Sequence, residues 1–286
     1  MIDRRTLLAA GVLAATPSRA VTAGVATGGL TRLRVDSDRL YLPATIGGFA
    51  VEALLDSAAE TSIVDVGLAA RLGLRGGEPV TARGTGAATT AATLVRGVAI
   101  EVAGLRLTPP TVAVIDLGDV AARLGAAIPL IVGRDLFDAG ALTLAIDGAL
   151  LGVGPSGGMA PGRPMPLTAR RGIETLPLTI EGIAAHADFD LGNGGTVLIG
   201  AAFAARHGLL RDRATGTIPG GGIGGGATQT TFIVRSLDLA GVRFADVPVA
   251  VDASPTANDA NIGVRLLRRF GIVTDFPARR VWLDAL

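Results

Sequence analysis

The chain has 286 residues, of which 49% are hydrophobic and 18% charged, so it is too apolar to be a disordered protein. Its 26 basic residues, all of them arginine, nearly cancel the 25 acids, and no basic stretch is dense enough to neutralise a run of phosphates. This excludes a nucleic-acid partner. The lack of cysteine excludes a disulfide, a thiol nucleophile and a thiolate metal site. The 41 glycines and 15 prolines favour many short strands over long helices.

The N-terminus has the pattern of an export signal. Residues 1–20 combine the Arg4-Arg5 pair, an apolar run and a small-residue ending at Ala20, which predicts a signal peptide of the twin-arginine type. We therefore expect an exported protein, periplasmic or secreted. The apolar run is shorter than the roughly 20 residues that span a bilayer, which disfavours the alternative of an uncleaved anchor. An ordinary N-terminal helix is a third interpretation, and no stretch of the mature chain is expected to span a membrane.

The first half of the chain alternates strand-like runs with glycine-rich turns. After a small-residue stretch that ends near residue 30, an apolar strand leads to Asp56, which is followed by small residues at a sharp turn. The further elements expected are a short helix in 63–74, a hairpin in 80–94 with its tip at Gly84, Thr85 and Gly86, a strand and helical turn in 128–137, and a closing hairpin in 141–153. Residues 154–166 have the composition of a linker.

The second half repeats the order of elements in the first. Pro43 lies 56 − 43 = 13 residues before Asp56, and Pro177 lies 190 − 177 = 13 residues before Asp190. The other matching blocks, in order, are 69–74 with 204–209, 95–116 with 234–252, and 130–137 with 261–270. A period this long indicates two copies of one fold rather than a solenoid. We predict homologous lobes at 32–153 and 167–286, joined by the 154–166 linker and related by a pseudo-twofold axis.

Such an axis would bring Asp56 and Asp190 together at the interface of the lobes. Two carboxylates within hydrogen-bond reach cannot both ionise cheaply, so the pair would hold one proton. The ionised member could then take a proton from a water held between them, while the protonated member hydrogen-bonds a carbonyl oxygen. This chemistry splits an amide bond with water.

The motifs around both aspartates resemble those of the retropepsin-like aspartic peptidases, in a fused two-lobe form that covers nearly all of residues 32–286. The matching stretches are Leu54–Ala59 with Ile131–Asp135, and Phe189–Asn193 with Asn261–Gly263. The resemblance implies an all-β fold with short helices, a monomer, and a peptide or protein substrate, with no cofactor and no metal. It implies that Asp56 and Asp190 are catalytic. It also implies a substrate-binding role for Ser57, Gly84, Thr85, Gly86, Gly192, Gly222, Ile223 and Gly224. Residues 84–86 and 222–224 of this set would lie on two flaps.

The sequence departs from the family pattern beside each aspartate. In the family, a hydroxyl after each Asp reaches across to the opposite loop; Ser57 can form this contact, whereas Leu191 cannot. The next position is normally glycine, so Ala58 fits only if its φ is negative. These departures support an alternative function, a two-lobed peptide-binding protein with weak or no hydrolysis. The substrate preference and the presence of a pro-segment stay open.

Three other interpretations compete for the second motif. Asp190–Thr196 resembles the phosphate motif of actin-like ATPases and sugar kinases, and the glycine run 220–226 could then be a phosphate cradle. No Lys-Ser or Lys-Thr follows that run, and Asp56 would be left unexplained. Asp188 and Asp190 resemble the Asp-x-Asp of phosphotransferases, but glycine stands where Thr or Val should follow. His186, Asp188 and Asp190 share one face of a strand and could bind a metal, although partly exposed strand residues are the simpler interpretation.

Overall fold

The computed structural model describes residues 29–86 and 88–286, so the signal predicted at 1–20 lies outside the described residues. This part of the chain is mostly β-strand, which agrees with the predicted all-β class, and its helices are short. The helices are α1 (Val66–Arg71), α2 (Gly118–Leu124), α3 (Arg134–Phe137), α4 (Ala201–Arg206) and α5 (Val264–Leu267). Within 29–86 and 88–286, no helix is long and apolar enough to cross a membrane.

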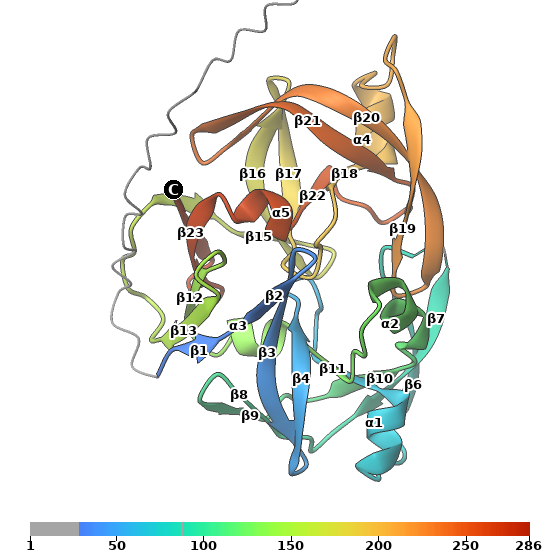
Figure 1. Ribbon diagram of the computed structural model, residues 1–286, viewed down its shortest axis with the longest axis vertical. Helices are drawn as coiled ribbons and strands as arrows, with labels where there is room; N and C mark the ends of the chain where they lie inside the picture. The colour runs from blue at the N-terminus through green and yellow to red at the C-terminus, as the bar shows by residue number, and fades with distance from the viewer. Residues whose placement is uncertain (1–28, 87) are drawn as a thin grey trace, which may run out of the picture.

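A 10-stranded sheet contains the strand that leads to Asp56, and it occupies the lower half of Figure 1. Its strands are β2 (Arg34–Asp36), β3 (Arg39–Ile46), β4 (Phe49–Leu55), β5 (Ile63–Asp65), β6 (Glu78–Arg83), β7 (Thr89–Val95), β8 (Ile100–Val102), β9 (Leu105–Leu107), β10 (Val112–Ile115) and β11 (Leu130–Val132). At its centre β4 runs parallel to β11, β11 antiparallel to β5, and β5 parallel to β10.

An 8-stranded sheet contains the strand that leads to Asp190, and it occupies the upper half of Figure 1. Its strands are β15 (Thr168–Arg170), β16 (Ile173–Ile180), β17 (Ile183–Phe189), β18 (Val197–Gly200), β19 (Gly216–Gly222), β20 (Gly225–Leu239), β21 (Val242–Asp252) and β22 (Ala260–Ile262). At its centre β17 runs parallel to β22, β22 antiparallel to β18, and β18 parallel to β21. The two sheets therefore share the same central sequence of pairings around their aspartates.

A 6-stranded sheet joins the two halves of the chain. Its strands are β1 (Thr31–Arg32), β12 (Ala141–Ala145), β13 (Leu150–Gly154), β14 (Arg163–Pro166), β23 (Phe270–Asp275) and β24 (Arg280–Ala285). The seam between the halves is the antiparallel pair β12–β23, in which Leu142 lies opposite Thr274. The end of the expected linker is part of this sheet, because β14 pairs with β24.

Hairpins with two-residue turns lead into both aspartate strands. Gly47 and Gly48 connect β3 to β4 with φ values of 55° and 82°, and Glu181 and Gly182 connect β16 to β17 with φ values of 52° and 79°. Two successive positive φ values define a type I′ turn, whose twist matches that of the flanking strands. The turn fixes the register of each hairpin, and with it the residue at which β4 and β17 end.

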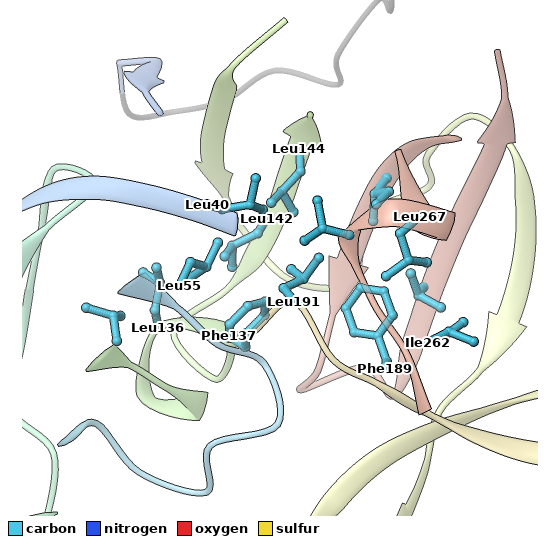
Figure 2. Packing of buried hydrophobic residues seen from close by; sticks show 14 of the residues in the cluster. Leu40, Leu55, Leu136, Phe137, Leu142, Leu144, Phe189, Leu191, Ile262 and Leu267 are labelled. Carbon is cyan, nitrogen blue, oxygen red and sulfur yellow. The ribbon is translucent and has the colours of Figure 1, made fainter. Parts of the chain in front are cut away.

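One hydrophobic cluster runs through both halves of the molecule. Figure 2 shows Leu191 between Phe137, which comes from α3, and Phe189, which ends β17. Leu191 is completely buried. The loop that carries Asp190 is thus packed into the shared core, and fully burying a leucine contributes about 1.5 to 3 kcal/mol.

Candidate active site

Asp56 and Asp190 begin two loops of the same design. The backbone N–H of Asp56 donates to Val132 O at 3.0 Å, and that of Asp190 donates to Ile262 O at 3.1 Å. These bonds continue the parallel pairs β4–β11 and β17–β22 by one residue beyond each strand. Both carboxylates are therefore presented at the end of a strand rather than inside a sheet.

Each loop then turns back so that two backbone amides face its own carboxylate. Ala58 N and Ala59 N donate to Asp56 Oδ1 at 2.8 and 3.1 Å. Gly192 N and Asn193 N donate to Asp190 Oδ1 at 2.9 and 3.0 Å. Ala58 does not have a positive φ, so alanine meets the condition set for this position.

Glycines after β11 and β22 let the two loops close. A Cβ on Gly133 would stand 2.7 Å from Thr61 O, and a Cβ on Gly263 would collide with Asn193 O. The next residue in each case bonds the loop, because Arg134 N donates to Ala59 O and Val264 N donates to Asn193 O, both at 2.9 Å. A side chain at either glycine would push the loop off its carboxylate-binding conformation.

Ser57 connects the two loops across the core. Its Oγ donates to Phe189 O at 2.6 Å and accepts a hydrogen bond from Leu191 N at 2.9 Å. Ser57 is only 3% exposed, so these bonds are shielded from water. Leu191 has no hydroxyl with which to return the contact, and its side chain fills the adjacent core instead.

The carboxylates of Asp56 and Asp190 lie beside each other. A Cβ on Gly192 would stand 2.5 Å from Asp56 Cγ, while the amide of the same glycine binds Asp190. Burial raises the pKa of Asp56, and the neighbouring charge of Asp190 raises it further. Burial also raises the pKa of Asp190, against the hydrogen bonds from Asn261 Nδ2 and from the backbone of Asn193 and Gly192. Both shifts favour a pair that keeps a proton above the usual range of a carboxyl group.

The two predicted flaps meet tip to tip. They are the hairpins β6–β7 and β19–β20, and they approach each other on the right of Figure 1. Gly86 N donates to Ile223 O at 3.1 Å, and Ala88 N donates to Gly224 O at 2.9 Å. Arg123, from α2, binds the second flap through Gly222 O at 2.7 Å. A Cβ on Gly84 would stand 2.8 Å from Ile223 O, so the close approach of the tips needs glycine.

A small apolar cluster lies under the first flap and receives the tip of the second. It contains Tyr41, Leu54 and Ile131 from the strands around Asp56, and Ile223 packs against it. This packing holds the tip of the second flap against the strands around Asp56.

The structure thus gathers the predicted site residues into two groups. The first group is the carboxylate pair, Asp56 and Asp190, with the neighbouring Ser57 and Gly192. The second group is the contact between the flaps, formed by Gly84, Thr85, Gly86, Gly222, Ile223 and Gly224. Sequence reasoning missed Asn261, whose Nδ2 donates to Asp190 Oδ2 at 2.7 Å. The available signal was its block, 261–270, in which an amide stands at a site where the matching block 130–137 is apolar.

The competing interpretations of the second motif find less support. The glycine run forms the tip of the β19–β20 hairpin rather than a loop before a helix. Asp188 binds Asn258 Nδ2 at 2.6 Å. In the part of the chain that the structure describes, no group of three or more His, Cys, Asp or Glu side chains is arranged to hold a metal ion.

The comparisons with known proteins agree with the geometry of the first half. Residues 42–148 match the aspartyl protease family model, Asp_protease_2. This aspartyl protease match includes Asp56 and the first flap and ends before Asp190. It supports a protease function for the chain. No curated protein matches the sequence.

Ser57→Ala is expected to destabilise the protein by about 1 to 3 kcal/mol, because it leaves Phe189 O and Leu191 N without their shared partner in the core. Chemical denaturation measures this loss. Ser62→Ala is a matched control, since Ser62 Oγ is buried and accepts from Gly133 N within one half of the chain. Both variants should lose stability, but only Ser57→Ala should alter the titration of Asp190. Equal titration curves for the two variants would contradict a role for Ser57 in placing that loop.

Proposed function

We propose that the chain is an aspartic peptidase in which Asp56 and Asp190 share one proton and activate a water molecule held between them. The observation that carries this proposal is the Ser57 hydroxyl, which bonds the Asp190 loop from the Asp56 loop. The like design of the loops and the aspartyl protease match over 42–148 support it further.

The reaction needs one ionised and one protonated carboxyl group. The ionised aspartate takes a proton from the water while the water oxygen bonds to the carbonyl carbon. The protonated aspartate gives its proton to the carbonyl oxygen. The first aspartate then gives its new proton to the amide nitrogen, and the C–N bond breaks. The second recovers a proton from one hydroxyl of the intermediate, which leaves a carboxylic acid and an amine. The pair ends with the single proton with which it began.

The flaps give the substrate its place in this proposal. A peptide would lie between the carboxylates and the joined tips, which must separate to admit it. The bonds to break are few, chiefly those from Gly86 N and Ala88 N to the second flap. Apolar substrate side chains would contact the cluster around Tyr41 and Leu54.

The domain organisation and location that we propose follow the sequence. Two homologous lobes, 32–153 and 167–286, are related by a pseudo-twofold axis, and the shared order of pairings around β4 and β17 supports this. The protein would act as a monomer, because both carboxylates come from one chain. Residues 1–20 would direct it out of the cytoplasm, as a periplasmic or secreted enzyme.

The test is cleavage of a mixed peptide library by the purified protein between pH 3 and pH 8, with and without a chelator. We expect cleavage that survives the chelator and declines toward pH 8, because the raised pKa values of Asp56 and Asp190 keep one proton on the pair in acid and lose it as the pH rises. Mass spectrometry of the products measures it. Abolition by the chelator would contradict this mechanism. Peptide binding without cleavage at any pH would favour the peptide-binding alternative.

A further inference from the structure

Asn261 is a buried amide that contacts one carboxylate of the pair. It lies in β22, is 6% exposed, and its Nδ2 donates to Asp190 Oδ2 at 2.7 Å. Asn193 Nδ2 in turn donates to Asn261 Oδ1 at 2.7 Å. Because Asn261 Oδ1 is engaged by a donor, its Nδ2 must face Asp190, which settles the orientation of the amide. Asp190 therefore receives three hydrogen bonds, two on Oδ1 and one on Oδ2.

Asp56 has no such donor. The position equivalent to Asn261 is Ile131: each lies two residues before the glycine that closes an aspartate loop. The strand pairings agree, since Leu54 lies opposite Ile131 and Asp188 lies opposite Asn261, each two residues before its aspartate. Ile131 is buried and apolar. Among the described residues, Asp56 receives hydrogen bonds only from Ala58 N and Ala59 N, both on Oδ1.

The charged groups around Asp190 differ from those around Asp56. Three charged groups lie near Asp190: Asp56 on the opposite loop, Asp188 on the strand that leads to Asp190, and Arg39 on β3. Arg39 is a cation and favours a charge on Asp190, whereas the two neighbouring carboxylates oppose it. The largest influences on Asp56 are burial, the charge of Asp190 and the hydrogen bonds of its own loop, and none of these comes from an arginine.

We propose that Asn261 is a positioning residue that holds the negative charge of the pair on Asp190 and leaves the shared proton on Asp56. This rests on the proposed peptidase function, and it divides the work between the aspartates. Asp190 becomes the group that takes the proton from water, and Asp56 becomes the group that protonates the carbonyl oxygen. Asn193 supports this by holding the amide of Asn261 in place.

The experiment is a titration of the two side-chain carboxyls by ¹³C NMR, with signals assigned from Asp56→Asn and Asp190→Asn. Between the two ionisations of the pair, the parent should show an ionised Asp190 and a protonated Asp56. Asn261→Ala should raise the acidic ionisation of the pair by about 1 to 2 pH units and shrink the difference between the carboxyls, because a hydrogen bond to a charged group is lost. Asn261→Ile, which copies Ile131, should give the same result if the alanine variant does not fold.

Asn258→Ala is the matched control, because it removes an amide donor of the same kind from Asp188, outside the pair. It should shift the titration of Asp188 and leave the acidic ionisation of the pair in place. An unchanged pair in both Asn261 variants, or a parent with its proton on Asp190, would overturn the proposal.

The titration does not depend on peptide cleavage, so the two proposals can fail separately. A parent that shows the expected titration but cleaves no peptide at any pH keeps the role of Asn261 and loses the peptidase function. An active parent whose titration is unaffected in Asn261→Ile does the reverse. If the parent is active, Asn261→Ala should shift the acidic limb of its kcat/KM profile to higher pH, with little change in KM.

Discussion

Asp56→Asn and Asp190→Asn are each expected to lower kcat/KM for peptide cleavage by about 10²- to 10⁴-fold, the range of general acid–base catalysis. Asparagine keeps the shape of the side chain and can still accept the loop amides that bind Oδ1. It cannot take a proton from water or give one to a carbonyl oxygen. The loss should therefore appear in kcat rather than in KM, measured on a peptide from the library.

Unfolding should not account for the loss in these variants. Burial raises the pKa of both aspartates, which means that the folded protein holds their charged forms at a cost, and an amide removes that cost. Asp56→Asn should be at least as stable as the parent at neutral pH. Asp190→Asn should gain less, because its NH2 group would face Asn261 Nδ2, which donates to Oδ2 in the parent. Asp246→Asn is the matched control, because Asp246 is exposed on β21 and asparagine tolerates its φ of 49°. Retention of more than a tenth of the activity in either dyad variant would contradict the mechanism.

The sequence could predict the aspartate loops because their determinants are local and occur twice. An apolar strand, an aspartate and small residues define each loop, and the glycines at 133 and 263 mark where it is closed. The hairpins at 80–94 and 141–153 followed from the same kind of signal, in which turn residues separate two strand-like runs. These features depend only on neighbouring residues or on a strand of the same half, so they can be recognised in a single sequence.

The long-range contacts could not be predicted in this way. The bond from Ser57 Oγ to Phe189 O joins residues 132 positions apart, and only the family resemblance led us to expect a contact between the loops. The flap bond from Gly86 N to Ile223 O joins two glycine-rich turns, and nothing in either turn specifies the other as its partner. The strand Arg163–Pro166 was missed because its prolines and glycine neighbours predict a linker, whereas pairing with β24 at a sheet edge tolerates proline. Asn261 was missed because its signal is not local: it appears only when residues 261–270 are compared with the apolar residues of 130–137.

Asp188→Asn is expected to stabilise the protein at pH 8 by up to about 4 kcal/mol. Asp188 is 7% exposed, and burial raises its pKa to about 7, against 3.8 for an unperturbed aspartate. The difference is about 3 pH units, and each unit corresponds to about 1.36 kcal/mol. None of the largest influences on this carboxyl comes from an arginine, and it accepts a hydrogen bond from Asn258 Nδ2. Its charged form is therefore held in the core without a cation.

The sign of the pH dependence follows from the raised pKa. Between pH 3.8 and about 7, the folded protein binds the Asp188 proton and the unfolded chain does not, so stability falls as the pH rises through this window. Above about 7 the loss is complete and constant. Burial raises the pKa of Asp252 as well, which adds to the trend and persists in the variant. Glu181, whose pKa the Arg213 hydrogen bond lowers to about 2, loses its contribution only below pH 4.5.

The measurement is urea denaturation of the parent and Asp188→Asn at pH 5 and pH 8. The parent should be less stable at pH 8 than at pH 5, and the variant should remove most of that difference. The variant should gain less at pH 5, about 1.6 kcal/mol, because pH 5 is only about 1.2 units above the unfolded pKa of 3.8. Asn258 Nδ2 can still donate to an asparagine oxygen, so the core hydrogen bond is kept. Asp246→Asn should change neither value. A parent equally stable at both pH values, or a variant that gains nothing at pH 8, would show that Asp188 is charged at no cost because a cation or water reaches it.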